Sequence, residues 1–127
     1  NPEDLYLSKL NKTLCSISSD NDLYVLEPIP EIRIDVPLTI SRKLFLGKDP
    51  STGISIFDYE NRNKKIIKQL NESKNICDFK TIKTSNYLCS SDNFCKANDG
   101  KMPLYFDDDH LSEYGNKKLI PAFKKIN

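Results

Sequence analysis

The sequence predicts an α/β fold with a parallel sheet. Segments with helical and strand patterns alternate along the chain, in the order helix, strand, helix, strand, helix. The two candidate strands are short apolar runs, which is the pattern of strands buried in a parallel sheet. With 127 residues, the chain is long enough for one domain at most.

The helices are predicted from apolar residues at helical spacing and from the residues at their boundaries. Pro37 is suited to open a helix, because its fixed φ fits the first turn, and Gly47 is suited to end it. The predicted helices cover residues 2–14, 37 to 43 or 46, 54–70, 80–88 and a last segment from 112 onward.

The last helix has the clearest local signals. Ser112 is a good N-cap, because its hydroxyl accepts a hydrogen bond from an unpaired backbone N–H of the first turn. We expect Leu119, Ile120 and Phe123 to face inward. Pro121 should kink or break the helix, since proline removes a backbone donor.

The predicted strands are Leu23–Leu26 and Asn75–Phe79, both apolar and bounded by polar residues. Prolines at 28, 30 and 37 should keep residues 28–37 irregular and extended, because proline disfavours helix in the residue before it. The polar stretch 90–100 is predicted to be a loop.

Composition excludes several classes of protein. The net charge is +1, so no broad positive field favours nucleic acid or an anionic membrane. The longest apolar runs are far too short for a transmembrane helix or a secretory signal. The chain begins at Asn1 without a Met, so we expect a trimmed or processed chain rather than a native start.

The four cysteines allow one or two disulfides, with three possible complete pairings. A structural zinc site is disfavoured, because there is no C-x-x-C pair and only one histidine. Cys89 and Cys95 flank a short polar loop that a disulfide could close, which would indicate an oxidising compartment. A free cysteine that packs as a small apolar residue is an equally good interpretation of either position.

The only histidine lies three residues after a carboxylate, in the sequence Asp107-x-x-His110. In a turn, this spacing lets the aspartate accept a hydrogen bond from the imidazole Nδ1–H and leaves Nε2 to take a proton from a nucleophile. The alternative is an acidic turn with a surface histidine, which such a short motif also fits. A metal site formed by the three consecutive aspartates and His110 is less favoured, because consecutive side chains of an extended chain point in opposite directions.

The whole stretch Leu104–Leu119 (LYFDDDHLSEYGNKKL) resembles the last conserved block of the SGNH (GDSL-type) hydrolases and acyltransferases. It is most similar to the SGNH domain fused to bacterial acyltransferase-3 membrane proteins. Further matches are Leu26–Glu31 (LEPIPE) after a strand, Leu88–Cys89, and Cys95 with the segment Asp99–Tyr105. The resemblance covers the chain from about Leu23 onward.

The resemblance implies a role for each matching residue. Asp107 would be the acid and His110 the general base of a Ser-His-Asp triad, while Asp108 and Asp109 would have no triad role. It also implies a disulfide between Cys89 and Cys95. No cofactor or metal is implied.

The family's Gly-Asp-Ser block, which carries the nucleophile, is not found in the sequence, and Gly53-Ile54-Ser55 is a poor substitute because no predicted strand precedes it. We therefore expect residues 1–127 to be the C-terminal part of one three-layer α/β/α SGNH-type domain, inactive or unstable without its N-terminal part.

The intact parent is expected to be an O-acyltransferase that modifies surface polysaccharide or lipopolysaccharide sugars. It would lie in the bacterial periplasm, tethered to the inner membrane and supplied with acyl groups by a membrane acyltransferase domain. No nucleic-acid partner is expected. The alternatives are a carbohydrate esterase, or a carbohydrate-binding or scaffold remnant that has lost its nucleophile.

Overall fold

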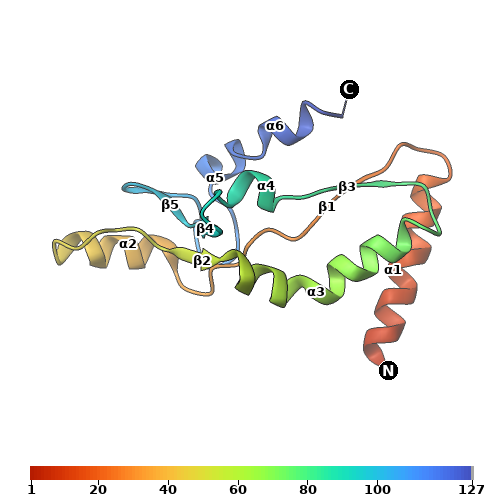
Figure 1. Ribbon diagram of the computed structural model, residues 1–127, viewed down its shortest axis with the longest axis horizontal. Coiled ribbons are helices and arrows are strands. Elements are labelled where there is room, and N and C mark those ends of the chain that lie inside the picture. The colour runs from red at the N-terminus through yellow and green to blue at the C-terminus, as the bar shows by residue number, and fades with distance from the viewer. Residues whose placement is uncertain (127) are drawn as a thin grey trace. The chain divides into compact units, whose positions relative to one another are not determined.

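The structure is a computed structural model that describes residues 1–126 (Figure 1). Short strands and helices alternate along it, which confirms the α/β class. The elements in chain order are α1 (Pro2–Ser18), β1 (Tyr24–Leu26), α2 (Val36–Phe45), β2 (Gly53–Ser55), α3 (Ile56–Ser73), β3 (Lys80–Ile82), α4 (Ser85–Leu88), β4 (Phe94–Lys96), β5 (Asn98–Asp99), β6 (Met102–Pro103), α5 (Glu113–Lys117) and α6 (Ile120–Phe123).

The strands form three two-stranded sheets in the described part of the chain. β1 and β3 pair in parallel, with Tyr24 opposite Lys80 and Leu26 opposite Ile82. The pairs β2–β4 and β5–β6 are antiparallel. The predicted parallel pairing therefore occurs at β1, while the exposed side chain of Leu26 shows that this strand is less buried than the apolar run suggested.

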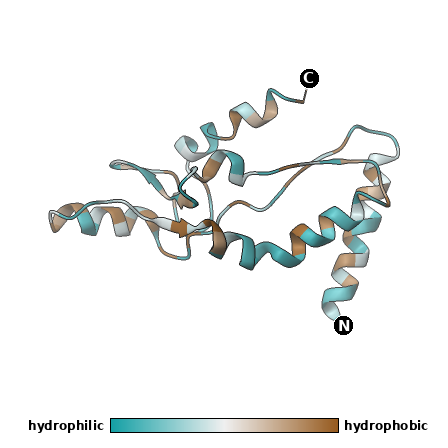
Figure 2. Cartoon of the chain, viewed as in Figure 1, coloured by the Kyte–Doolittle hydropathy of each residue, from teal (hydrophilic) through white to brown (hydrophobic). Residues whose placement is uncertain are grey.

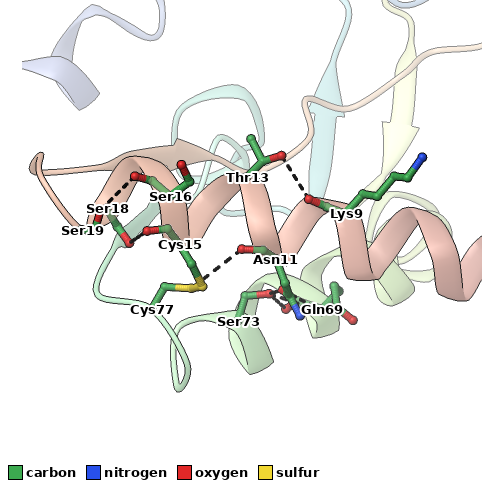
Figure 3. Close-up of a disulfide and its surroundings, with 10 residues drawn as sticks. All are labelled: Lys9, Asn11, Thr13, Cys15, Ser16, Ser18, Ser19, Gln69, Ser73 and Cys77. Carbon is green, nitrogen blue, oxygen red and sulfur yellow. Dashed lines mark hydrogen bonds between the residues drawn. A yellow bond between two sulfur atoms is a disulfide. The ribbon is translucent and has the colours of Figure 1, made fainter.

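The chain divides into two compact units, and α3 passes from the second into the first. The first unit comprises Asn1–Glu27 and Arg62–Ile82. Its core is formed by Leu14, Leu70, Cys77 and Phe79. A disulfide joins Cys15 on α1 to Cys77, and Ser73 is hydrogen-bonded to Asn11 beside it (Figure 3).

The second unit begins at Pro28 and contains α2, β2, the start of α3, and the chain from Lys83 onward. Its core gathers residues from the proline-rich segment, α2, α4, the link between β4 and β5, and the C-terminal block: Ile32, Val36, Ile40, Leu88, Ala97, Leu104, Tyr105, Leu111 and Leu119. The prolines of residues 28–37 contribute carbonyl acceptors to it. Pro28 O accepts hydrogen bonds from the Tyr59 hydroxyl (2.9 Å) and the Thr84 hydroxyl (2.7 Å).

The predicted helices at 2–14, 37–46 and 54–70 are found with small changes at their ends. The predicted helix 80–88 is wrong in its first part, because Lys80–Ile82 form strand β3 and only Ser85–Leu88 are helical. α2 begins beside Pro37 and is capped by Asp35, whose carboxylate accepts the N–H of Leu38 at 2.9 Å; Gly47 follows it with φ of 65°. α3 starts two residues later than predicted, because Ile54 and Ser55 are in β2. Figure 2 shows its apolar residues in separate bands at its start and middle. Within residues 1–126, no helix is both long and apolar enough to span a bilayer.

Two predictions about strands are wrong. Residues 75–79 form a turn instead of a strand, because the N–H groups of Ile76 and Cys77 bond back to Ser73 O at the end of α3 (3.0 and 2.9 Å). The second strand is β3, which follows this turn. The expected loop 90–100 contains β4 and β5, and β4 pairs with β2 through residues distant in sequence.

The C-terminal helix is broken as predicted but is oriented differently. Ser112 caps α5 by accepting the Gly115 N–H at 3.0 Å, and Pro121 lies in the first turn of α6. Leu119 is buried, whereas Ile120 and Phe123 are about half exposed. The break after α5 changes the helical phase, so Ala122 takes the buried position instead.

Candidate catalytic site

Asp107 and His110 lie in one tight turn between Tyr105 and α5. One carboxylate oxygen of Asp107, Oδ1, accepts the backbone N–H groups of Asp109 (3.0 Å) and His110 (2.7 Å). The other, Oδ2, is 2.8 Å from His110 Nδ1. The carboxylate therefore both closes the turn and receives a hydrogen bond from the ring. Nδ1 then carries the proton, so Nε2 is left as an acceptor.

Backbone groups of the proline-rich segment hold this turn. The N–H groups of Ile32 and Arg33 donate to Asp108 O at 2.8 and 3.3 Å, and the N–H of Val36 donates to Asp107 O at 3.3 Å. The buried hydroxyl of Tyr105 donates to Pro30 O at 2.6 Å. The two segments that the sequence matched to the family are thus in direct contact.

The pair is electrostatically polarised. Partial burial acts to raise the pKa of Asp107, but the two backbone N–H donors and His110 outweigh it and lower that pKa to about 2. The pKa of His110 is raised, first by its hydrogen bond to Asp107, then by the negative charges of Asp107 and Asp109. Both shifts favour the ion pair of carboxylate and imidazolium, which is the state that a general base reaches after taking a proton.

Asp109 also reaches the ring. Its Oδ1 lies 2.7 Å from His110 Nδ1 and forms an ion pair with the ring when the ring is protonated. The sequence argument against a shared metal site assumed an extended chain, in which consecutive side chains point in opposite directions. That assumption is wrong for this turn, because the carboxylates of Asp107 and Asp109 both approach His110 Nδ1. Ligand atoms of Asp107, Asp109 and His110 lie within 4.8 Å of one another, so a cation could contact all three. The short Nδ1–carboxylate distances are those of a protonated ring nitrogen between two acceptors.

An aromatic ring covers one face of the histidine. Phe106 and His110 are stacked, with ring centroids 5.4 Å apart and planes inclined by 21°. The Phe106 residue is 63% exposed and the His110 side chain 65% exposed. The imidazole is thus held by Asp107 and Phe106 while remaining open to an incoming group.

The hydroxyls of Ser55 and Ser112 have structural roles. The Ser55 hydroxyl accepts the Asp58 N–H and donates to the Asp58 carboxylate, so it caps the start of α3. The Ser112 hydroxyl accepts the Gly115 N–H and donates to Pro103 O at 2.9 Å. Neither is placed as the partner of His110.

The Cys89–Cys95 disulfide forms, with an S–S distance of 2.07 Å. It ties the end of α4 to β4, where Cys95 is fully buried. The next residue but one, Ala97, accepts the Leu104 N–H at 2.8 Å and so connects this hairpin to the start of the last block. The disulfide therefore stabilises the hairpin to which the segment before Asp107 is hydrogen-bonded.

Sequence reasoning missed Asp109 and Phe106. The turn itself could have indicated Asp109. An aspartate that accepts the N–H groups of the residues two and three positions later bends the chain, so the side chain two positions after Asp107 turns toward the ring. Phe106 was grouped with its apolar neighbours, but it follows buried Leu104 and Tyr105 as the exposed residue of the run.

The comparisons with known proteins identify the family of the chain. The family model described as "SGNH domain (fused to AT3 domains)" matches residues 1–125, so the similarity begins before Leu23 and includes α1. Neither a curated protein nor a solved structure matches the chain. Because the family match covers nearly every residue, the chain belongs to the SGNH domain family whose members are fused to AT3 domains.

Proposed function

We propose that this chain supplies the acid and the base of a Ser-His-Asp triad in an SGNH O-acyltransferase. The single observation that carries the proposal is the 2.8 Å contact between Asp107 Oδ2 and His110 Nδ1, on a ring that stays exposed. This contact orients the imidazole and leaves Nε2 available as a base. Membership of a family fused to AT3 domains supports acyl transfer as the reaction class.

The nucleophile is proposed to be a serine from an N-terminal part of the same domain. His110 Nε2 takes the serine proton as the oxygen attacks the acyl carbonyl, and the leaving group departs with a proton returned by the ring. His110 then takes the proton of an acceptor hydroxyl, whose oxygen attacks the acyl-enzyme; the serine oxygen leaves and receives that proton back from the ring. Asp107 stabilises the imidazolium in both steps.

We propose a sugar hydroxyl of a cell-surface polysaccharide or lipopolysaccharide as the acceptor and acetyl as the acyl group. The exposed ring of Phe106 beside His110 supports a sugar, because the C–H face of a pyranose packs well on an exposed aromatic ring. A membrane acyltransferase domain of the parent would deliver the acyl group. The proposed location is the bacterial periplasm at the inner membrane, and the two disulfides fit such an oxidising compartment.

The test is His110→Ala in the intact parent protein, with transfer of acetyl to the sugar as the readout. The activity should fall by about three orders of magnitude or more. Folding should survive, because the side chain is mostly exposed. Near-normal activity with a folded protein would rule out His110 as the base.

Two further readouts separate the proposal from its alternatives. Mass spectrometry of the wild-type protein with donor should reveal an acylated serine outside this chain, whereas a scaffold remnant would show none. Release of free acetate at the same rate with and without sugar would identify an esterase in place of a transferase.

A further inference from the structure

Two carboxylates approach the same nitrogen of the proposed base. Asp107 Oδ2 and Asp109 Oδ1 lie 2.8 and 2.7 Å from His110 Nδ1. A ring nitrogen carries one proton, so it donates a hydrogen bond to one acceptor while the other acts through its charge. The hydrogen bond runs to Asp107, which leaves the Asp109 contact as an ion pair.

The two aspartates differ in what else they do. The Asp107 carboxylate also accepts two backbone N–H groups and so shapes the turn. Within residues 1–126, the Asp109 carboxylate makes no hydrogen bond or ion pair other than its contact with the ring. The turn places the Asp109 backbone, while the Asp109 carboxylate contacts the histidine and has no structural task of its own.

We propose that Asp109 is a second positioning residue for His110, which shares the task of Asp107 in orienting the ring and stabilising its protonated form. This inference rests on the proposed function of the pair. Asp109 adds a second negative charge at Nδ1 when Nε2 takes a proton. It is also close enough to accept the Nδ1–H when Asp107 cannot.

The charged groups around the ring are the three aspartates of the turn. Asp107 and Asp109 contact it, Asp108 acts on it from farther away, and Phe106 covers one face without charge. Asp108 is the natural control, since Asp108→Asn removes the same charge from the same run. Its backbone carbonyl, which binds Ile32 and Arg33, is unaffected by that change.

The experiment is a double-mutant cycle on acetyl transfer by the intact protein. Loss of the triad acid elsewhere costs about 10⁴-fold when the ring adopts the wrong tautomer. Because Asp109 can still orient the ring, Asp107→Asn should lower the transfer rate only about 10- to 100-fold. Asp109→Asn should lower it about 2- to 10-fold, and the double variant about 10⁴-fold. Asp108→Asn should leave each of these values unchanged.

The fold loss of activity in the double variant should therefore exceed the product of the fold losses in the two single variants. A double variant that loses no more than that product, or an Asp109→Asn effect equal to that of Asp108→Asn, would overturn the proposal. Failure of the triad assignment has a different signature, because His110→Ala would then retain activity.

A second readout follows the ring directly. In the intact protein labelled with ¹⁵N-histidine, the imidazole signals of His110 are those absent from His110→Ala, because residues 1–127 contain no other histidine. We expect the Nδ1–H tautomer in the wild type and in Asp107→Asn, and the Nε2–H tautomer preferred by a free histidine only in the double variant. A switch to the free tautomer in Asp107→Asn alone, or its presence in the wild type, would contradict the shared role.

Discussion

Gly115 tests whether packing beneath the turn controls the site. A Cβ added at Gly115 would lie 2.0 Å from Leu104 O and 3.1 Å from Leu111 Cδ2. Ordinary contact begins at 3.4 Å, so the backbone must separate by 3.4 − 2.0 = 1.4 Å. The same carbonyl accepts the Ser112 N–H at 2.9 Å, and the turn that carries Asp107 and His110 lies between these two residues. Gly115→Ala should therefore displace the turn.

The expected magnitudes follow from this overlap. Overpacking of a tight contact costs about 3 kcal/mol, from which about 1 kcal/mol is offset because alanine favours helix more than glycine does. The net loss of about 2 kcal/mol corresponds to a fall in Tm of roughly 6 to 10 °C for a domain of this size. A displacement of about 1 Å at the reacting groups lowers the rate on the order of 100-fold.

The assay compares Gly115→Ala with Gly100→Ala in the intact protein, by thermal unfolding and by acetyl transfer. Gly100 has φ of 56° and nothing within 4 Å of its added Cβ, so alanine there costs about 1 kcal/mol of backbone strain without a clash. Gly100→Ala should keep nearly full activity. If Gly115→Ala is as stable and as active as Gly100→Ala, the reasoning from packing is refuted.

Four further predictions concern charge and covalent links. The rate should rise with pH through the raised pKa of His110, above the ordinary value of 6.5, because the base must be neutral; Asp107→Asn should move this limb to lower pH. The ion pair of Asp107 and His110 should stabilise the fold fully at pH values below the ordinary histidine pKa and lose this stabilisation as the pH rises through the raised pKa of His110. A His110 titration at the ordinary pKa would contradict this prediction. Asp107→Asn should reduce acetyl transfer far more than Asp108→Asn, and equal losses would show that the acid is misassigned. Replacing the cysteines of Cys15–Cys77 by alanine should lower the free energy of unfolding by about 4 kcal/mol, and replacing those of Cys89–Cys95 should lower it by about 2 kcal/mol. The difference is expected because the two disulfides close loops with sequence separations of 62 and 6 residues. Denaturant titration measures both losses, and equal losses would argue against a loop-entropy origin.

The features predicted from sequence are those with local causes. Pro37 and Gly47 bound α2, Ser112 caps α5, and Asp107 pairs with a histidine three residues later, all because neighbouring residues determine these conformations. Strand β3 was missed, because the apolar residues at 77 and 79 are buried by a turn and a disulfide instead of a sheet. The Cys15–Cys77 pairing joins residues far apart in the chain, so no local pattern could select it.

The placement of prolines explains why the site needs a distant segment. Pro28 and Pro30 have no N–H and contribute only carbonyls, which accept the hydroxyls of Tyr59, Thr84 and Tyr105. Nearby, the backbone N–H groups of residues 32, 33 and 36 all donate to the carbonyls of Asp107 and Asp108.

Arg33 has φ of 69°, the left-handed conformation, and its N–H and that of Ile32 converge on the one carbonyl of Asp108. With the carbonyls of residues 107 and 108 bound on that side, the backbone orientation of the turn is fixed, while the carboxylates of Asp107 and Asp109 reach His110. The orientation of the His110 ring thus depends on backbone donors some seventy residues earlier as much as on Asp107, as the proposed role of a preorganised base would require.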